Sequence, residues 1–381
     1  MRVALMTDGI QPYVTGGMQK HSFYVAKFLA AAGIEVDLYH YNANPQFDID
    51  ALEVFTPQER ANIHSMVFEF PPPGKLPGHY IRRSLRYSQQ LYKAFKKRPT
   101  VDFVYIKGFA GWQFLKEKAK GRSLPPSGIK FHGMNMFQTP PSFRGSLEYA
   151  MLRPPVRFNM KHADYVFSYG GKITDIIAGT GVERSRIVEL PTGIEKQWVA
   201  GNIRFTEGQR KFLYVGRYER LKGIEEINQA IKKLEKEFDF EYHFVGPIPE
   251  QLHLPSEKVK YWGKITDAQQ MKAVVRSCDV VTCPSYSEGL PNVILEGMSQ
   301  GLAVLATNVG AINFLVNEEN GWLIEQPDSN AIADAMRNAI TCDAKKMDAR
   351  KQASIEKISR ELTWDHIANR LVTTVQSLAG K

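Results

Sequence analysis

Short apolar runs alternate with amphipathic stretches along the whole chain. Strand-like runs in the first half are RVALMT, IEVDLYHY, DFVYIK, GIKFHG and DYVFSY, and those in the second half are KFLYVG, FEYHFVG, DVVTCP and GLAVLA. Segments with a helical pattern, such as 18–32, 223–238 and 266–277, lie between them. Because strands alternate with helices, the pattern predicts an α/β fold in which helices cover both faces of parallel sheets.

The alternation begins again at about residue 211, after the loop-like segment PTGIEKQWVAGNIRFTEGQR. A chain of 381 residues is long enough for two domains of ordinary size. We therefore expect a Rossmann-like domain at 1–200, a second at 201–362, and a C-terminal helix at 363–381 that could pack back on the first domain. In such sheets, ligands bind in the loops that follow the carboxyl ends of the strands.

One of these loops, SEGLPNVILE, holds Glu288 and Glu296 eight positions apart. Pro291 suits the start of a helix because its φ is fixed, so Glu288 should lie on the loop and Glu296 about two turns into the helix. Eight residues of helix rise roughly 12 Å. The two carboxyls of a glycosidase are only about 5 to 9.5 Å apart. The spacing favours carboxylates that bind separate hydroxyl groups of one extended ligand, although each alone could be a solvated acid.

Two further loops carry glycine or positive charge at the start of a predicted helix. Gly16 and Gly17 follow the first strand, where glycines let backbone amides approach a ligand and the helix N-terminus favours an anion. Arg217 and Lys222 follow a strand that ends at Gly216, and two fixed cations there suit a diphosphate. Either loop alone could equally be a turn or a solvated basic segment.

Three other positions complete the set of candidates. His21 lies one turn into the helix that follows Gly17, and His132 lies at the end of a strand. A lone strand-end histidine is more often structural than catalytic. The loop WGKIT, which contains Ile265, is apolar enough to hold a base.

Taken together, these loops resemble the retaining glycosyltransferases of family four, which have the GT-B fold of two Rossmann-like domains with parallel sheets that face a central cleft. The resemblance rests on Gly16-Gly17 with His21, His132, Gly216-Arg217 with Lys222, and the E-x7-E motif of Glu288 and Glu296. It is strongest over 211–325 and looser over the first 200 residues.

The resemblance implies a role for each residue in binding a nucleotide-sugar donor. Glu296 should hold the ribose hydroxyls, and Glu288 should face the donor sugar. Arg217 and Lys222 should neutralise the departing diphosphate, and His132 should contact the sugar near the reacting carbon. The further donor contacts are the backbone or side chains of Gly16, Gly17, Gly216, Ile265, Gly289 and Leu290.

The resemblance also implies the reaction and its partners. The enzyme should transfer a hexose or N-acetylhexosamine from a UDP- or GDP-sugar to a glycan or lipid-linked acceptor, with retention of configuration, and His21 should contact the acceptor. We expect no cofactor and no metal, because Arg217 and Lys222 supply the charge, and we interpret Asp48 and Asp50 of FDID as a solvated turn. The alternatives are a nucleotide-sugar epimerase and a non-catalytic binder of anionic surfaces.

Positive charge is concentrated in the first half of the chain. Residues 1–200 hold 26 Lys and Arg against 16 Asp and Glu, whereas 201–381 hold 23 against 24. Segment 70–101 holds eight basic residues and no acidic one. Its helical part, 79–98, could lie on an anionic membrane surface or could pack its apolar face on the core. The apolar face comprises Ile81, Leu85, Ser88, Tyr92 and Phe95.

Composition narrows the setting. No run of eighteen apolar residues is present, so we expect no membrane span, and MRVALMTDGI reads as a core strand rather than a signal peptide. Cys278, Cys283 and Cys342 lack metal-type spacing and favour a reducing compartment. We expect a cytoplasmic enzyme of cell-surface glycan, lipopolysaccharide or glycolipid biosynthesis, which could lie on the inner face of the plasma membrane and which binds no nucleic acid.

Overall fold

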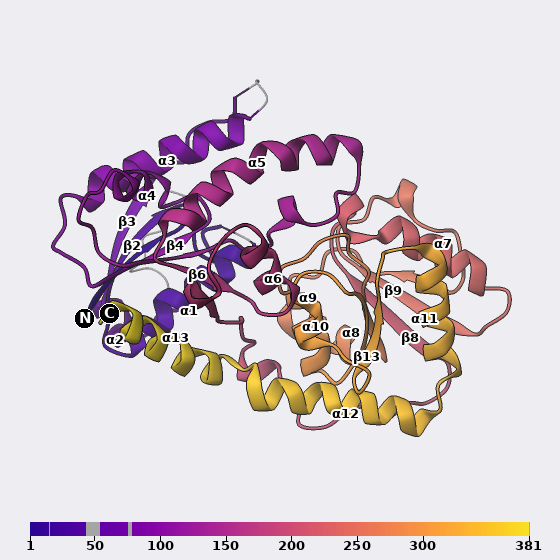
Figure 1. Ribbon diagram of the computed structural model, residues 1–381. Helices are drawn as coiled ribbons and strands as arrows, with labels where there is room; N and C mark the ends of the chain where they lie inside the picture. Colours follow the sequence, from indigo (N-terminus) through magenta and orange to yellow (C-terminus); the bar gives the residue numbers. More distant parts are fainter. Residues whose placement is uncertain (15, 43–53, 75–77, 381) are drawn as a thin grey trace.

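The computed structural model describes residues 1–14, 16–42, 54–74 and 78–380, and it contains two Rossmann-like domains (Figure 1). Within these residues the first domain has a parallel sheet in the order β3-β2-β1-β4-β5-β6-β7, and the second has one in the order β10-β9-β8-β11-β12-β13. The predicted α/β fold with two parallel sheets is therefore confirmed. In both sheets the order reverses beside the first strand, β1 or β8, and ligands bind at this switch point in such folds.

The strands of the first sheet are β1 (Arg2–Met6), β2 (Glu35–Tyr41), β3 (Ile63–Phe68), β4 (Phe103–Lys107), β5 (Ser127–Lys130), β6 (Tyr165–Ser168) and β7 (Ile187–Glu189). Its helices are α1 (Gly17–Ala31), α2 (Pro57–Ala61), α3 (His79–Phe95), α4 (Trp112–Ala119), α5 (Phe143–His162) and α6 (Lys172–Gly179). The inner strands β1 and β4 are mainly apolar and almost wholly buried, because helices cover both of their faces.

The strands of the second sheet are β8 (Arg210–Val215), β9 (Phe240–Val245), β10 (Val259–Tyr261), β11 (Val280–Cys283), β12 (Ala303–Thr307) and β13 (Gly321–Ile324). The helices are α7 (Ile224–Leu234), α8 (Ala268–Arg276), α9 (Asn292–Ser299), α10 (Ile312–Leu315), α11 (Ser329–Thr341), α12 (Ala344–Glu361) and α13 (Trp364–Ala379). Among the described residues, no helix has the length and apolar character needed to cross a membrane.

The chain crosses between the domains twice, and the two crossings lie side by side. The amide of Ile194 donates to the carbonyl of Leu362 (2.8 Å), and the amide of Trp364 donates to the carbonyl of Ile194 (2.9 Å). Helix α13 then returns to the first domain (Figure 1). There Trp364 stacks on Tyr24 of α1 with ring centroids 4.5 Å apart. These contacts join the second crossing directly to the helix that follows β1.

Helix α3 packs its apolar face on the first domain. Tyr87, Leu91 and Tyr92 are buried, and the hydroxyl of Tyr87 donates to the carbonyl of Thr7 (2.8 Å). The exposed face carries basic side chains, namely Arg82, Arg86, Lys93, Lys96 and Lys97. Of the two alternatives for 79–98, packing of the apolar face on the protein is the one observed, so only the basic face is available to a membrane.

Candidate functional site

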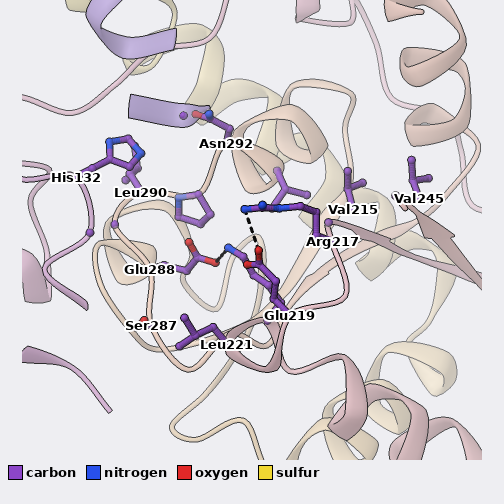
Figure 2. A pocket seen from close by; sticks show the side chains of 18 of the residues that line it. His132, Val215, Arg217, Glu219, Leu221, Val245, Ser287, Glu288, Leu290 and Asn292 are labelled. Carbon is purple, nitrogen blue, oxygen red and sulfur yellow. Dashed lines mark hydrogen bonds and ion pairs between the residues drawn. The ribbon is translucent and has the colours of Figure 1, made fainter. Parts of the chain in front are cut away.

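A cavity of about 640 Å³ lies between the domains, where the loops after the strands meet. The first domain contributes Gly17 after β1 and His132 after β5, and the second contributes Arg217 after β8 and Glu288 after β11. Figure 2 shows His132 and Arg217 on opposite sides of this cavity, which we call the donor cavity. An adjoining cavity of about 430 Å³ shares Gly17 with it and is lined by Glu296.

The carboxylate of Glu288 is buried, and one of its oxygens is held by hydrogen-bond donors. Lys222 Nζ and Ser285 Oγ each lie 2.7 Å from Oε1 of Glu288. Burial disfavours the charge of Lys222, but the neighbouring Glu288 outweighs burial and raises the pKa of Lys222. The two side chains therefore form a charged pair in the wall of the donor cavity, with Lys222 available to a second anion.

The other predicted cation, Arg217, is held less tightly. Its side chain is 75% exposed, and Nη2 lies 2.9 Å from Oε1 of Glu219 (Figure 2). An exposed pair of this kind is weak and rearranges at little cost. Arg217 can therefore turn toward an anion that enters the cavity.

His132 is a neutral hydrogen-bond donor. Burial, followed by the charges of Lys107, Lys130 and Lys222, lowers the pKa of His132 to about 3. Nδ1 of His132 lies 2.6 Å from the hydroxyl oxygen of the buried Tyr169. Among the described residues, Nδ1 is the one hydrogen-bond partner of this hydroxyl group. A buried hydroxyl that donates to nothing costs about 1 to 3 kcal/mol, so Tyr169 donates to Nδ1. The ring hydrogen of His132 is then on Nε2.

Glycines let the backbones of the two domains approach closely beside His132. A Cβ at Gly289 would lie 2.1 Å from the carbonyl oxygen of His132, and a Cβ at Gly17 would lie 3.0 Å from Nε2 of His132. Gln138 joins the domains here, since its amide nitrogen donates to the carbonyls of Gly133 (2.6 Å) and Glu288 (2.7 Å). The loop after β5 and the loop after β11 therefore form one continuous wall.

Glu296 lies in the second turn of α9, closer to the helix start than the two turns that the sequence suggested. Burial raises its pKa to about 7, against the opposing effect of Lys20. Lys20 Nζ in turn lies 3.3 Å from Oε1 of Glu195. The carboxyl group of Glu296 is thus poised to change its charge near neutral pH.

The structure brings most of the predicted site residues together. Besides Gly17, His132, Arg217, Glu288 and Glu296, the two cavities are lined by Gly16, Gly216, Lys222, Ile265, Gly289 and Leu290. These residues therefore line the cavities as a group, and the role of each one stays a prediction.

His21 lies elsewhere. It is 3% exposed, lines neither cavity, and contacts Lys107 Nζ through Nδ1 (3.1 Å), because the inward face of α1 carries it. A direct contact between His21 and the acceptor finds no support in this placement. Asp48 and Asp50 lie outside the described residues.

Sequence reasoning did not identify Tyr169, Gln138, Ser285 or Asn292. Tyr169 is the last residue of the predicted strand DYVFSY, so its place at a strand end was the available signal. Gln138 follows a short 3-10 helix (Asn135–Phe137) and had no such signal. Its function depends on a contact with residue 288 that only the folded chain creates.

Two family models match successive parts of the chain. The model described as Glycosyltransferase Family 4 matches residues 15–198, and the model described as Glycosyl transferases group 1 matches residues 209–342. Among curated proteins, the D-inositol 3-phosphate glycosyltransferase of Corynebacterium urealyticum is 26% identical over 54% of this chain and 55% of its own. The capsular polysaccharide biosynthesis glycosyltransferase CapM of Staphylococcus aureus is 26% identical over 44% of this chain and 47% of its own. The matches thus span about half the length of these relatives.

Solved structures match almost the whole fold. The sucrose-phosphate synthase of Thermosynechococcus elongatus has a TM-score of 0.78 and 19% identity, and the match covers 100% of this chain and 99% of that one. Anabaena HepE in complex with UDP-glucose has a TM-score of 0.65 and 16% identity, with 99% and 100% covered. The two family models and the two-domain fold agree: this chain belongs to the group 1 glycosyltransferases of family four, which have the GT-B fold.

Proposed function

We propose that this protein is a retaining glycosyltransferase that moves a hexose or N-acetylhexosamine from a nucleoside diphosphate sugar to an acceptor hydroxyl. The observation that carries the proposal is the donor cavity. The Lys222–Glu288 pair, His132 and the first residues of α9 all line this one space. The family assignment and the UDP-glucose bound by the similar HepE structure support a nucleotide-sugar donor. The similarity to CapM, a capsular polysaccharide biosynthesis glycosyltransferase, supports a role in cell-surface polysaccharide biosynthesis.

In this proposal, the diphosphate lies between Arg217, Lys222 and the first amides of α9. The bond from the anomeric carbon to the phosphate oxygen breaks, and its electron pair stays on that oxygen. Cations and helix N-termini placed beforehand stabilise the developing charge. The acceptor oxygen attacks on the same face, where the departing phosphate oxygen can take the acceptor's proton. Glu288 and His132 Nε2 bind the sugar, and Glu296 binds the ribose.

The proposal is tested by incubating the protein with isotopically labelled nucleotide sugars and analysing the products by mass spectrometry. The donor is first selected by a thermal-shift panel of UDP, GDP and their sugars, since a bound ligand raises stability by mass action. Transfer of the labelled sugar to a second molecule is the expected result. Interconversion of the nucleotide sugar would instead indicate an epimerase, and stabilisation by none of the panel would contradict the donor site.

We expect the transfer to need no divalent metal, since Arg217 and Lys222 supply positive charge beside the diphosphate. Among the described residues, no group of three or more His, Cys, Asp and Glu is placed to hold a metal ion, and experiment must decide. The rate with excess EDTA should equal the untreated rate. A strict requirement for Mn²⁺ or Mg²⁺ would contradict this expectation and would make Asp48 and Asp50 candidate metal ligands.

Tyr169→Phe should slow turnover roughly fivefold, because it removes a hydrogen bond of about 1 kcal/mol that holds the hydrogen of His132 on Nε2. The direct readout is the nitrogen NMR spectrum of labelled histidine, in which the Nδ1–H form should appear. Tyr105→Phe is the matched control, because Tyr105 is equally buried and its hydroxyl has no hydrogen-bond partner among the described residues. Slower turnover without a change in the His132 signals would show that Tyr169 acts only through packing.

We also propose that the enzyme works at the cytoplasmic side of a membrane. The exposed basic face of α3 supports this, since each Lys or Arg near an anionic bilayer contributes about 1 kcal/mol. Tyr87, Leu91 and Tyr92 of α3 take no part because the protein covers them.

A further inference from the structure

The loop after β5 contains a strained residue just beyond the candidate His132. Met134 has φ 49° and ψ 26°, in the left-handed region, and it is the only described residue other than glycine with a positive φ. This conformation crowds the Cβ of any residue except glycine, so it persists only where surrounding contacts impose it. Strain of this kind occurs mainly at ligand-binding and catalytic sites, which makes this turn a candidate for a ligand contact.

Hydrogen bonds on both sides fix this turn. Gln138 Nε2 donates to the carbonyl of Gly133 (2.6 Å) and to the carbonyl of Glu288 in the second domain (2.7 Å). On the other side, Nε of Arg153 on α5 donates to the carbonyl of Met136 (2.7 Å). Because none of these bonds involves a ligand, the turn is held in place before a substrate binds, and its side chains are positioned in advance.

The turn places Asn135 in the wall of the donor cavity with an unused hydrogen-bond acceptor. Asn135 lines the cavity, and its Oδ1 is buried without a hydrogen-bond partner among the described residues. A buried amide oxygen that accepts nothing costs stability, and native proteins rarely keep one without a ligand, a water molecule or a function to account for it. Gly133 leaves room for this oxygen, since a Cβ at that position would lie only 2.4 Å from Oδ1 of Asn135. The turn therefore holds a free acceptor against the space that a ligand would occupy.

The chemistry around Asn135 favours a hydroxyl group over a phosphate as its ligand. A diphosphate oxygen without a hydrogen cannot donate to Oδ1 and would be repelled by it. The cations of the cavity, Arg217 and Lys222, follow β8 in the second domain, whereas Asn135 and His132 follow β5 in the first. A hydroxyl group both donates and accepts, and an amide side chain does the same, so the two are complementary. A sugar hydroxyl is therefore the fitting partner at the first-domain wall.

We propose that Asn135 binds a hydroxyl group of the donor sugar and thereby helps to determine which sugar the enzyme transfers. This inference rests on the proposed function, in which Glu288 and His132 bind the sugar, and it adds a specificity-determining residue to that site. Oδ1 accepts a hydrogen bond from the hydroxyl when the correct sugar is bound. A sugar that lacks this hydroxyl, or carries it with inverted configuration, leaves the buried oxygen unpaired. Sites built to bind a hydroxyl reject analogues without it far better than apolar pockets separate ligands by size.

The test is a calorimetric comparison of three kinds of ligand. They are the nucleotide sugar selected by the thermal-shift panel, its nucleoside diphosphate without the sugar, and analogues of the nucleotide sugar that each lack one sugar hydroxyl. Asn135→Ala should weaken binding of the complete nucleotide sugar by roughly fivefold or more, because one hydrogen bond to the sugar is lost. Binding of the nucleoside diphosphate should stay unchanged, which also shows that the variant keeps its fold. Asn338→Ala, which removes an exposed side chain of α11, is the matched control and should leave every affinity unchanged.

The analogues show whether the lost contact is the proposed one. One analogue should bind the wild type roughly fivefold or more weakly than the complete nucleotide sugar does. The same analogue should bind Asn135→Ala no more weakly than it binds the wild type. This pattern arises because the missing hydroxyl and the missing amide belong to the same hydrogen bond, so the second removal costs nothing further.

The other outcomes overturn the inference in distinguishable ways. If Asn135→Ala binds the complete nucleotide sugar as tightly as the wild type does, the partner of Oδ1 is a water molecule or the acceptor substrate, and the inference is wrong. If the variant weakens every analogue by the same factor as the complete sugar, Asn135 acts on the shape of the cavity and not on one hydroxyl, and the inference is again wrong. Both results leave the proposed function intact, because the wild type still binds the donor. Failure of the wild type to bind any nucleotide sugar would refute the proposed function and this inference together.

Discussion

Lys222→Ala should lower kcat by roughly a hundred- to a thousandfold, the loss typical of removing one group that stabilises the charge of a leaving oxygen, about 3 kcal/mol. The structure supplies the physical reason. Lys222 Nζ is held 2.7 Å from Glu288 in the cavity wall, so its charge is in place before the donor arrives and needs little reorganisation during the reaction. Donor affinity should fall less than turnover, because the charge on the phosphate grows only as the bond breaks.

A double variant separates this role from a structural one. The comparison is with Glu288→Gln alone, because Glu288 itself binds the sugar in our proposal. If Lys222 served only to neutralise the buried Glu288, Lys222→Ala with Glu288→Gln would be no slower than Glu288→Gln, because the uncompensated charge would be gone. If Lys222 acts on the diphosphate, the double variant should be much slower than Glu288→Gln. Lys232→Ala, which removes an exposed lysine of α7, is the control and should leave kcat unchanged. Wild-type turnover in Lys222→Ala would refute the assignment.

The location of the site could be predicted because parallel strands bring their carboxyl ends to one edge. Residues as distant as Gly17, His132 and Glu288 follow β1, β5 and β11, and the topology alone places them around one cleft. The cation pair and the two glutamates were found for the same reason. The confirmed fold therefore brings these candidate residues around one cleft, while their roles stay predictions.

Other parts of the structure depend on contacts that periodicity does not encode. The sequence pattern did not predict strands β3, β7, β10 and β13. Strands β7 and β10 have only three residues each, and β3 includes the polar His64 and Ser65. The spacing of apolar residues in 79–98 revealed that α3 has an apolar face, but not which part of the protein covers that face. His21 shows the same limit, since the sequence placed it near a ligand loop and the rotation of α1 turned it into the core.

Glu296→Ala should weaken donor binding by roughly a hundredfold or more, since a carboxylate that accepts two ribose hydroxyls loses two charge-assisted hydrogen bonds of about 1.5 to 3 kcal/mol each. The buried position of Glu296 adds a pH dependence. Because burial raises its pKa to about 7, the carboxyl group is neutral below that pH and ionised above it. Only the ionised form can accept from both hydroxyls, so the donor should bind more tightly as pH rises from 6 to 8.

Calorimetric titration with the nucleotide sugar selected by the thermal-shift panel checks this expectation, because its diphosphate diester keeps a constant charge over this range whereas a free nucleoside diphosphate does not. Glu296→Gln is the matched variant, since it keeps the shape and removes the titration, and its weaker affinity should not vary with pH. The neighbouring charges are Lys20, which lowers the pKa of Glu296, and Glu195, which raises it. Lys20→Met should therefore move the rise in affinity to higher pH. A wild-type affinity that is constant from pH 6 to 8 would contradict the expected titration of Glu296. Wild-type affinity in Glu296→Ala would refute its contact with the ribose.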